Sequence, residues 1–274
     1  MSPNARSDNL SLTFGVLDIA TNFIFHSTMN ALLLCAGSAR RFYADGATRP
    51  KCLLQLSQTE TILDRMLRQV QSFSYSAVIG TGCGHEEVCA HLEAQNYVAQ
   101  TVYNADFATT NSIVTLWQMR DFIGDDTLLI NGDVVVENGA LELFQTLSQP
   151  QLLVKNLAQF DDDTYRVRFI SGENQTHRVL DMGKELRDEP SANCAAFLGV
   201  SRVGNASRFL QEIEKLLHSG SNQTWPTTAY RAMINDIGDH QNSGVRAVDI
   251  GARAFFDIDT PEEYRQARAV FSSL

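Results

Sequence analysis

The chain contains 274 residues, of which 44 % are hydrophobic and 20 % are charged, and its formal net charge is −10. This composition is typical of a folded globular protein, and the length suffices for one large domain with a sizeable core. The acidic excess argues against nucleic-acid partners, because phosphate backbones are bound by massed lysine and arginine. It argues against a polybasic membrane-binding patch for the same reason.

The cysteine spacing and the N-terminal segment predict the cellular compartment of the protein. Five cysteines without a C-x-x-C pair favour neither a disulfide framework nor a structural zinc site, and they fit a cytoplasmic protein. The apolar-leaning run over residues 12–25 is too short and too polar to span a bilayer, so we expect no membrane insertion. We predict an N-terminal extension over residues 1–28 and one functional domain over 29–274. A homodimer is compatible with the sequence.

After Met29, short apolar runs alternate with amphipathic segments. Strands are expected at 31–34, 77–80, 100–103, 127–130 and 152–155, and helices at 62–71, 86–95, 112–120 and 140–147. This alternation predicts an α/β fold in three layers, with a mostly parallel central sheet between helices. Closely spaced strands at 165–170, 179–182 and 195–200 predict a small antiparallel addition. The remaining expected elements are helices at 205–217 and 227–237, strands at 245–249 and 255–258, and a helix from Pro261.

One segment runs against the acidic trend. Residues 30–51 carry a net charge of +3, from Arg40, Arg41, Arg49 and Lys51 against Asp45. The sequence LLCAGSARRF at 33–42 predicts a strand that runs into a loop of small residues, where backbone N–H groups can approach a phosphate closely. An ordinary basic surface loop is the alternative. The Pro-Lys pair at the end of the segment favours phosphate binding.

Three aspartates are candidate metal ligands. Asp133 follows an apolar strand in the predicted sheet, and Asp257 and Asp259 lie two residues apart on one strand face. Oxygen ligands that converge from separate strands suit Mg²⁺, which keeps several waters and bridges substrate phosphates. A single aspartate at a strand end can instead cap a turn or a helix, and Asp259 precedes a threonine and a proline. Together the three predict a Mg²⁺ site.

These motifs resemble the nucleotidyltransferase superfamily, whose L-A-A-G-x-G-x-R…P-K-x-L signature matches residues 33–54, with Ala39 at the second glycine. The resemblance covers nearly everything from Met29 to the end. It implies a Rossmann-like, GT-A-like nucleotidyltransferase fold and an enzyme that transfers a nucleotidyl group from a nucleoside triphosphate to a phosphate. It further implies that Arg41 and Lys51 are catalytic and bind the triphosphate. Asp133 and Asp259 would hold Mg²⁺, with Asp257 in support.

Two further segments resemble one branch of the superfamily. YNADFATTNSI at 103–113 and VLDMGKEL at 179–186 resemble segments of bacterial phosphocholine and aminoalkylphosphonate cytidylyltransferases. This implies CTP and a small acceptor such as phosphocholine or 2-aminoethylphosphonate. Lys184 would meet the acceptor, and Trp225 is the candidate aromatic wall for a cation. The residues implied for the nucleotide are Cys35, Ala36, Gly37, Ser38, Gly80, Gly82, Asn111 and Ser112.

From the residues alone, alternatives to these site roles and to this activity stay open. The alternative for Asn111 or Ser112 is a helix cap, and the alternative for Lys184 is a solvated lysine in a hairpin. A sugar-1-phosphate nucleotidyltransferase would share every catalytic residue and differ only in the acceptor pocket. A non-catalytic module that binds a nucleotide for regulation is the alternative from another functional class.

Overall fold

A large β-sheet organises the chain. The computed structural model describes residues 29–39, 42–43, 49–145, 149–173, 175–234 and 244–272; the predicted extension over 1–28 and Arg41 lie outside them. The strands of the sheet are β1 (Asn30–Cys35), β2 (Ser76–Thr81), β3 (Ala99–Tyr103), β4 (Leu128–Asn131), β6 (Gln151–Lys155), β7 (Arg166–Ile170), β8 (Thr176–Gly183), β9 (Cys194–Arg202) and β10 (Arg246–Asp249). The helices are α1 (Ile62–Ser72), α2 (His85–Ala94), α3 (Ser112–Gln118), α4 (Ala206–His218), α5 (Thr227–Ile234) and α6 (Pro261–Phe271).

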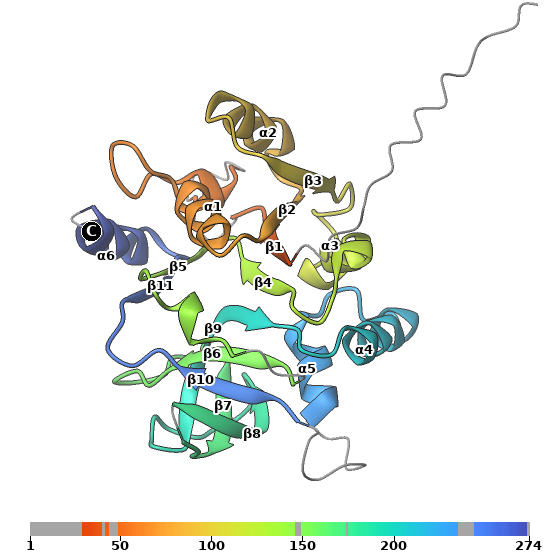
Figure 1. Ribbon diagram of the computed structural model, residues 1–274, viewed down its shortest axis with the longest axis vertical. Helices are drawn as coiled ribbons and strands as arrows, with labels where there is room; N and C mark the ends of the chain where they lie inside the picture. Colours follow the sequence, from red (N-terminus) through yellow and green to blue (C-terminus); the bar gives the residue numbers. More distant parts are fainter. Residues whose placement is uncertain are drawn as a thin grey trace, which may run out of the picture.

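The sheet is mixed, with the order β3-β2-β1-β4-β9-β6-β10-β8-β7. Strands β1 to β4 are parallel, whereas β9 runs antiparallel to both β4 and β6. Strand β7 also pairs with β9, so β9, β6, β10, β8 and β7 close into a ring, which lies below the parallel strands in Figure 1. The α/β architecture is confirmed, but a mostly parallel sheet is not. The antiparallel part is much larger than predicted, because β9 inserts in the middle of the sheet.

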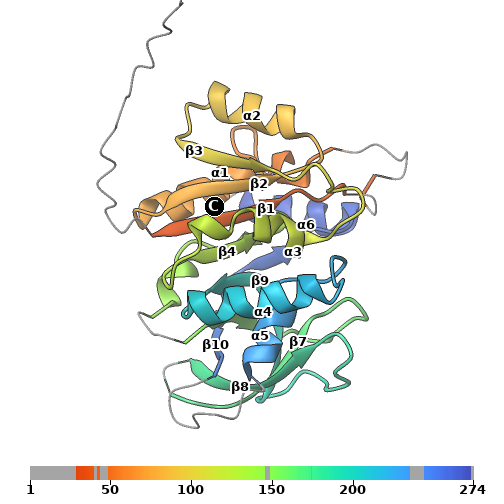
Figure 2. The same cartoon turned by 90° about the vertical axis from the view of Figure 1, so that its right-hand side faces the viewer.

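Alternating residues of the central strands supply two hydrophobic cores, one on each face of the sheet. In β1, Ala31 and Leu33 pack with residues of α1, α2 and α6, and Leu32 packs on the opposite face with residues of α3, α4 and α5. Figure 2 shows α4 and α5 lying across the sheet beside β9 and β10. The predicted helical cover on both faces is therefore present.

A small second sheet was not predicted and bears directly on the site. Strand β5 (Val134–Val136) pairs antiparallel with β11 (Phe255–Asp257), which sets Val134 opposite Asp257. The helix expected over 140–147 is wrong over 140–145, the part of it that the structure describes. A 3₁₀ turn, η3 (Leu141–Leu143), forms there instead, because the backbone becomes extended at Phe144 and the Gln145 N–H donates to the side chain of Gln151.

Within the described residues, the longest apolar stretches of helix fall short of what crossing a membrane requires. Helices α1, α2, α4 and α6 each combine buried and exposed residues, as expected for elements that cover a sheet, whereas α3 and α5 contain no exposed residue.

Candidate active site

Three carboxylates from distant parts of the chain meet at one end of the sheet. Asp133 follows β4, Asp257 ends β11, and Asp259 lies just before α6. One ligand oxygen from each lies within 4.8 Å of those of the other two. The turn that carries Asp133 presses against β1: Gly132 donates to the carbonyl of Leu34 at 3.1 Å, and a Cβ at Gly132 would lie 2.7 Å from that oxygen. Only glycine fits this close approach.

Lys51 reaches this acidic cluster from the 3₁₀ turn η1 (Lys51–Leu53). Its Nζ lies 3.0 Å from Asp133 Oδ2 and 2.5 Å from Asp259 Oδ1, and it also donates to the Ile258 carbonyl at 2.9 Å. Burial acts to lower the pKa of Lys51, but the two carboxylates outweigh it and raise that pKa. Lys51 therefore stays protonated at neutral pH and neutralises part of the cluster.

Burial and the neighbouring carboxylates shift the pKa of Asp257. Its side chain is exposed to solvent on the side of a cleft, and protein atoms surround it closely on the other sides. This crowding, together with the negative charges of Asp133 and Asp259, raises the pKa of Asp257 well above its ordinary value. Three carboxylates with one lysine leave a surplus of negative charge, and their oxygens are the ligands that hard divalent cations prefer. The donor set fits Mg²⁺.

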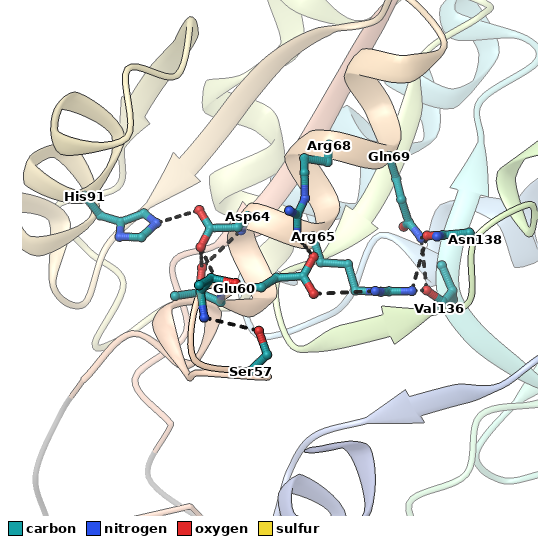
Figure 3. Close-up of polar contacts among 11 residues, drawn as sticks. Ser57, Glu60, Asp64, Arg65, Arg68, Gln69, His91, Val136 and Asn138 are labelled. Atoms are coloured by element: carbon teal, nitrogen blue, oxygen red, sulfur yellow. Dashed lines mark hydrogen bonds and ion pairs between the residues drawn. The ribbon is translucent and has the colours of Figure 1, made fainter. Parts of the chain in front are cut away.

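Side chains of helix α1 bind the end of strand β5, as Figure 3 shows for Arg65, Gln69 and Val136. Arg65 Nε and Gln69 Nε2 both donate to the carbonyl of Val136, at 3.2 and 3.0 Å. Arg65 is only 5 % exposed and also forms an ion pair with Glu60 at 3.6 Å. Because β5 ends at Val136 and pairs with β11, these contacts fix the strand that carries Asp257.

A pocket of about 170 Å³ opens on one side of the acidic cluster. Of the residues predicted to bind the nucleotide, Ala36, Gly37, Asn111 and Ser112 line it, together with Asp133. Asn111 also caps α3, since its Oδ1 accepts from the Ser112 N–H at 2.7 Å. Its Nδ2 donates to the carbonyl of residue 223, two positions before Trp225. The capping and pocket-lining interpretations of Asn111 therefore both describe its position.

A larger cleft of about 360 Å³ adjoins the first pocket. Both of the residues predicted to bind the acceptor line it, and they touch: Lys184 Nζ lies 5.2 Å from the ring centroid of Trp225 and 3.0 Å from Asp163 Oδ1. The cleft and the pocket share Leu34, Asn131, Asp133 and Trp225 as lining residues. Asp133 thus stands where the two spaces meet.

The structure places other predicted residues away from these two spaces. Neither is lined by Cys35, Ser38, Gly80 or Gly82 among the residues described. A Cβ at Gly80 would lie 2.5 Å from a methyl group of Thr115, and one at Gly82 would lie 2.6 Å from Phe107. Close packing of β2 and its following loop accounts for both glycines.

The sequence did not single out several residues that lie in the site. Asn131 lines both the pocket and the cleft. It lies two residues before Asp133, and because side chains two residues apart in an extended segment point to the same side, this spacing is the signal that could have identified it. Tyr165 and Phe197 face each other in the cleft with ring centroids 6.3 Å apart. Phe197 belongs to β9 and Tyr165 lies at the end of the loop before β7, so no local sequence pattern predicts that they meet.

No protein-family model matches the chain. The CMP-5'-(3-aminopropyl)phosphonate synthase of Streptomyces rubellomurinus is 24 % identical in an alignment that covers 89 % of this chain and 39 % of that protein. The chain spans between 27 % and 48 % of the length of the curated relatives that it matches.

The fold matches solved nucleotidyltransferases over nearly their whole length. The CTP:phosphocholine cytidylyltransferase of Streptococcus pneumoniae (LicC) superposes with a TM-score of 0.70 at 18 % identity, covering 89 % of this chain and 99 % of that one. The chain therefore has the fold of these nucleotidyltransferases. An apo UDP-glucose pyrophosphorylase superposes with a TM-score of 0.72 at 14 % identity, covering 90 % and 98 %. Folds of transferases that are named for different acceptors thus superpose on it equally well.

Proposed function

We propose that the chain transfers CMP from CTP to a small phosphorylated alcohol or phosphonate and releases pyrophosphate. The observation that carries the proposal is that Asp133, which accepts a hydrogen bond from Lys51 at 3.0 Å, lines both the smaller pocket and the larger cleft. Two substrates that bind in adjoining spaces can react only where those spaces meet. Relatives named for CMP-phosphonate synthesis and for CTP:phosphocholine transfer favour CTP as the donor.

The proposed reaction is an in-line displacement at phosphorus. An anionic oxygen of the acceptor forms a bond to the α-phosphorus of CTP, and the bond from the α-phosphorus to the bridging β-phosphate oxygen breaks. That oxygen leaves with the electron pair as part of pyrophosphate, and no protein nucleophile takes part. Catalysis then rests on positioning and on charge neutralisation. Lys51 would supply positive charge beside the cluster, and Arg41 would bind the triphosphate as the family resemblance implies.

The carboxylates of Asp133, Asp257 and Asp259 would hold the Mg²⁺ that this reaction requires. When bound, the ion screens the negative charge of the phosphates and stabilises the charge that develops on the leaving oxygen. The nucleotide-side residues of the proposal are Ala36, Gly37, Asn111 and Ser112, which line the smaller pocket. The family resemblance adds Cys35, Ser38, Gly80 and Gly82, which line neither space among the residues described.

The lining of the larger cleft favours an acceptor with a positively charged end. Tyr165, Phe197 and Trp225 line it together with Asp161 and Asp163. Aromatic rings and carboxylates attract an ammonium group through cation–π and Coulomb interactions. The same cleft also holds hydrogen-bonding side chains that a sugar could use, among them Asn131, Ser201 and Thr227. The acceptor screen described next decides between a cationic acceptor and a sugar 1-phosphate.

A pyrophosphate-release screen separates the candidate functions. CTP, UTP, GTP and ATP would each be offered with phosphocholine, 2-aminoethylphosphonate, glycerol phosphate and sugar 1-phosphates in the presence of Mg²⁺. We expect the highest rate with CTP and one of the two cationic acceptors. The highest rate with a sugar phosphate would establish the alternative transferase. Nucleotide binding without turnover of any pair would establish a regulatory binding module.

Replacing Lys184 by alanine is expected to raise KM for the acceptor by about tenfold or more, because a hydrogen bond to a charged group contributes about 1.5–3 kcal/mol. KM for CTP should stay near the wild-type value, since Lys184 lines only the larger cleft. Steady-state kinetics with each substrate varied in turn measures both constants. Lys215→Ala on α4, which removes a half-exposed lysine paired with Glu212, is the matched control. An unchanged acceptor KM in Lys184→Ala would remove Lys184 from the acceptor site.

We propose that the catalytic domain covers residues 29–274 and that residues 1–28 are an extension to it. The first core strand begins at Asn30, directly after Met29, and its partners β2 and β4 lie entirely within the domain. A chain that begins at Met29 is therefore expected to fold and to release pyrophosphate at the rate of the full chain. A folded but inactive shortened chain, judged by circular dichroism and turnover, would show that residues 1–28 contribute to the site.

A further inference from the structure

A buried arginine lies behind the acceptor cleft without lining it. Arg166 is the first residue of β7 and is only 6 % exposed. In the closed ring of strands, the backbone of Arg166 pairs with Gly183 of β8 on one side and with Ala196 of β9 on the other. Among the residues that the structure describes, no carboxylate lies within ion-pair distance of its guanidinium. A buried positive charge without an anionic partner is costly, so its placement calls for a reason.

The guanidinium bridges two loops through their main-chain oxygens. Arg166 Nη2 donates to the carbonyl of Asp161 at 3.0 Å, and Nη1 donates to the carbonyl of Lys184 at 3.1 Å. Its buried Nε has no hydrogen-bond partner, and Phe160 covers the group with its ring centroid 5.4 Å from Cζ. One rigid, planar group thus fixes the distance between two chain segments that are far apart in sequence.

Both bridged loops form the wall of the acceptor cleft. The first loop contributes Asp161, Asp163 and Thr164, and the second contributes Lys184. On the exposed side the loops meet again, where Lys184 Nζ lies 3.0 Å from Asp163 Oδ1. That pair is partly open to solvent and contributes little rigidity by itself. The buried Arg166 is the contact that can hold the backbone of both loops in place.

We propose that Arg166 is a positioning residue for acceptor specificity: it sets the spacing of the two loops that carry the acceptor-binding side chains. The inference rests on the proposed function for its kinetic consequence, but the bridge itself does not. Without the Arg166 guanidinium, the carbonyls of Asp161 and Lys184 lose their shared hydrogen-bond donor. The backbone from which the Lys184 side chain extends is then held less firmly relative to the loop of Asp161. Acceptor binding weakens, whereas the nucleotide pocket on the far side of Asp133 is unaffected.

Arg166→Gln and Arg166→Lys test this against Arg168→Gln. Arg168 lies two residues further along β7, but its guanidinium is 42 % exposed and pairs with Asp181 and Asp188. In Arg166→Gln we expect KM for the acceptor to rise about tenfold or more and KM for CTP to change less than about twofold. Arg166→Lys, which keeps the positive charge but loses the planar fork, should recover part of the loss. Arg168→Gln should leave both constants near wild type.

Hydrogen–deuterium exchange of the full chain tests the bridge without any turnover. Arg166→Gln should speed amide exchange in residues 161–165 and 184–187 and leave the segment around Asn111 unchanged. Faster exchange throughout the chain, or an equal rise in both KM values, would show a merely structural role and overturn the inference. An unchanged acceptor KM with unchanged exchange would also overturn it. If the wild-type chain released no pyrophosphate, the proposed function would fail, and the exchange data would still decide on the bridge.

Discussion

Asp133→Ala is expected to lower kcat by about 10²–10³-fold, the range seen when one preorganised electrostatic contact to a transition state is removed. Asp133 is the carboxylate that both the pocket and the cleft share, and its Oδ2 lies 3.0 Å from Lys51 Nζ. Losing it would remove a metal ligand at the point where the two substrates meet. KM for either substrate should change much less than kcat, because the contact acts mainly on the transition state.

The Asp133 variant should fold normally. A backbone hydrogen bond joins the segment of Asp133 to the segment of Asp257 and Asp259. In it the Ile258 N–H donates to the Asp133 carbonyl at 3.0 Å, so the Asp133 side chain is not involved. Removing one of three repelling carboxylates also relieves electrostatic strain. Circular dichroism and a melting curve check the fold. Asp121→Ala, which removes a side chain that is 82 % exposed, is the matched control for a lost aspartate. Turnover of Asp133→Ala close to that of the control would contradict the assignment of the site.

Lys51→Ala should reduce kcat on the same scale of about 10²–10³-fold. Its Nζ holds Asp133, Asp259 and the carbonyl of Ile258 at once, so the side chain both orders the cluster and supplies positive charge where phosphates are expected. Steady-state pyrophosphate release at saturating CTP and acceptor measures the loss. Lys215→Ala again serves as the lysine control.

A second readout separates a disordered cluster from a lost contact to substrate. Without Lys51, the three carboxylates within 4.8 Å of one another lose the lysine that pairs with Asp133 and Asp259, so a divalent cation should stabilise the variant more than the wild-type chain. We expect the melting temperature of Lys51→Ala to rise more steeply with Mg²⁺ concentration. Equal Mg²⁺ dependence in both proteins, together with wild-type turnover, would place Lys51 outside the site.

Local patterns predicted the parts of this molecule that local sequence decides. The apolar run of β1 ends in small residues, and the structure places that end, at Ala36 and Gly37, in the nucleotide-side pocket. Pro261 predicted the start of α6, and the structure adds a capping box between Thr260 and Glu263. The spacing of Asp257 and Asp259 predicted that they would share a site.

Long-range pairing decided the parts that the sequence did not reveal. Three valines are too short a run to indicate a strand, yet β5 pairs with β11 and thereby brings Asp257 to Asp133. The insertion of β9 between β4 and β6, which turns a mostly parallel sheet into a mixed one, depends on contacts far apart in the chain. The same holds for Arg166, whose two acceptor carbonyls come from loops that only the closed ring brings together.

Mass spectrometry of the products tests most directly whether this chain joins a nucleotide to a phosphorylated acceptor at the acidic cluster. The chain would be supplied with CTP, Mg²⁺ and the acceptor that the screen selects. We expect equal amounts of pyrophosphate and of a product that contains CMP linked to the acceptor, with both lost in Asp133→Ala. Release of CMP or CDP without a linked product, or a linked product formed equally well by Asp133→Ala, would contradict it.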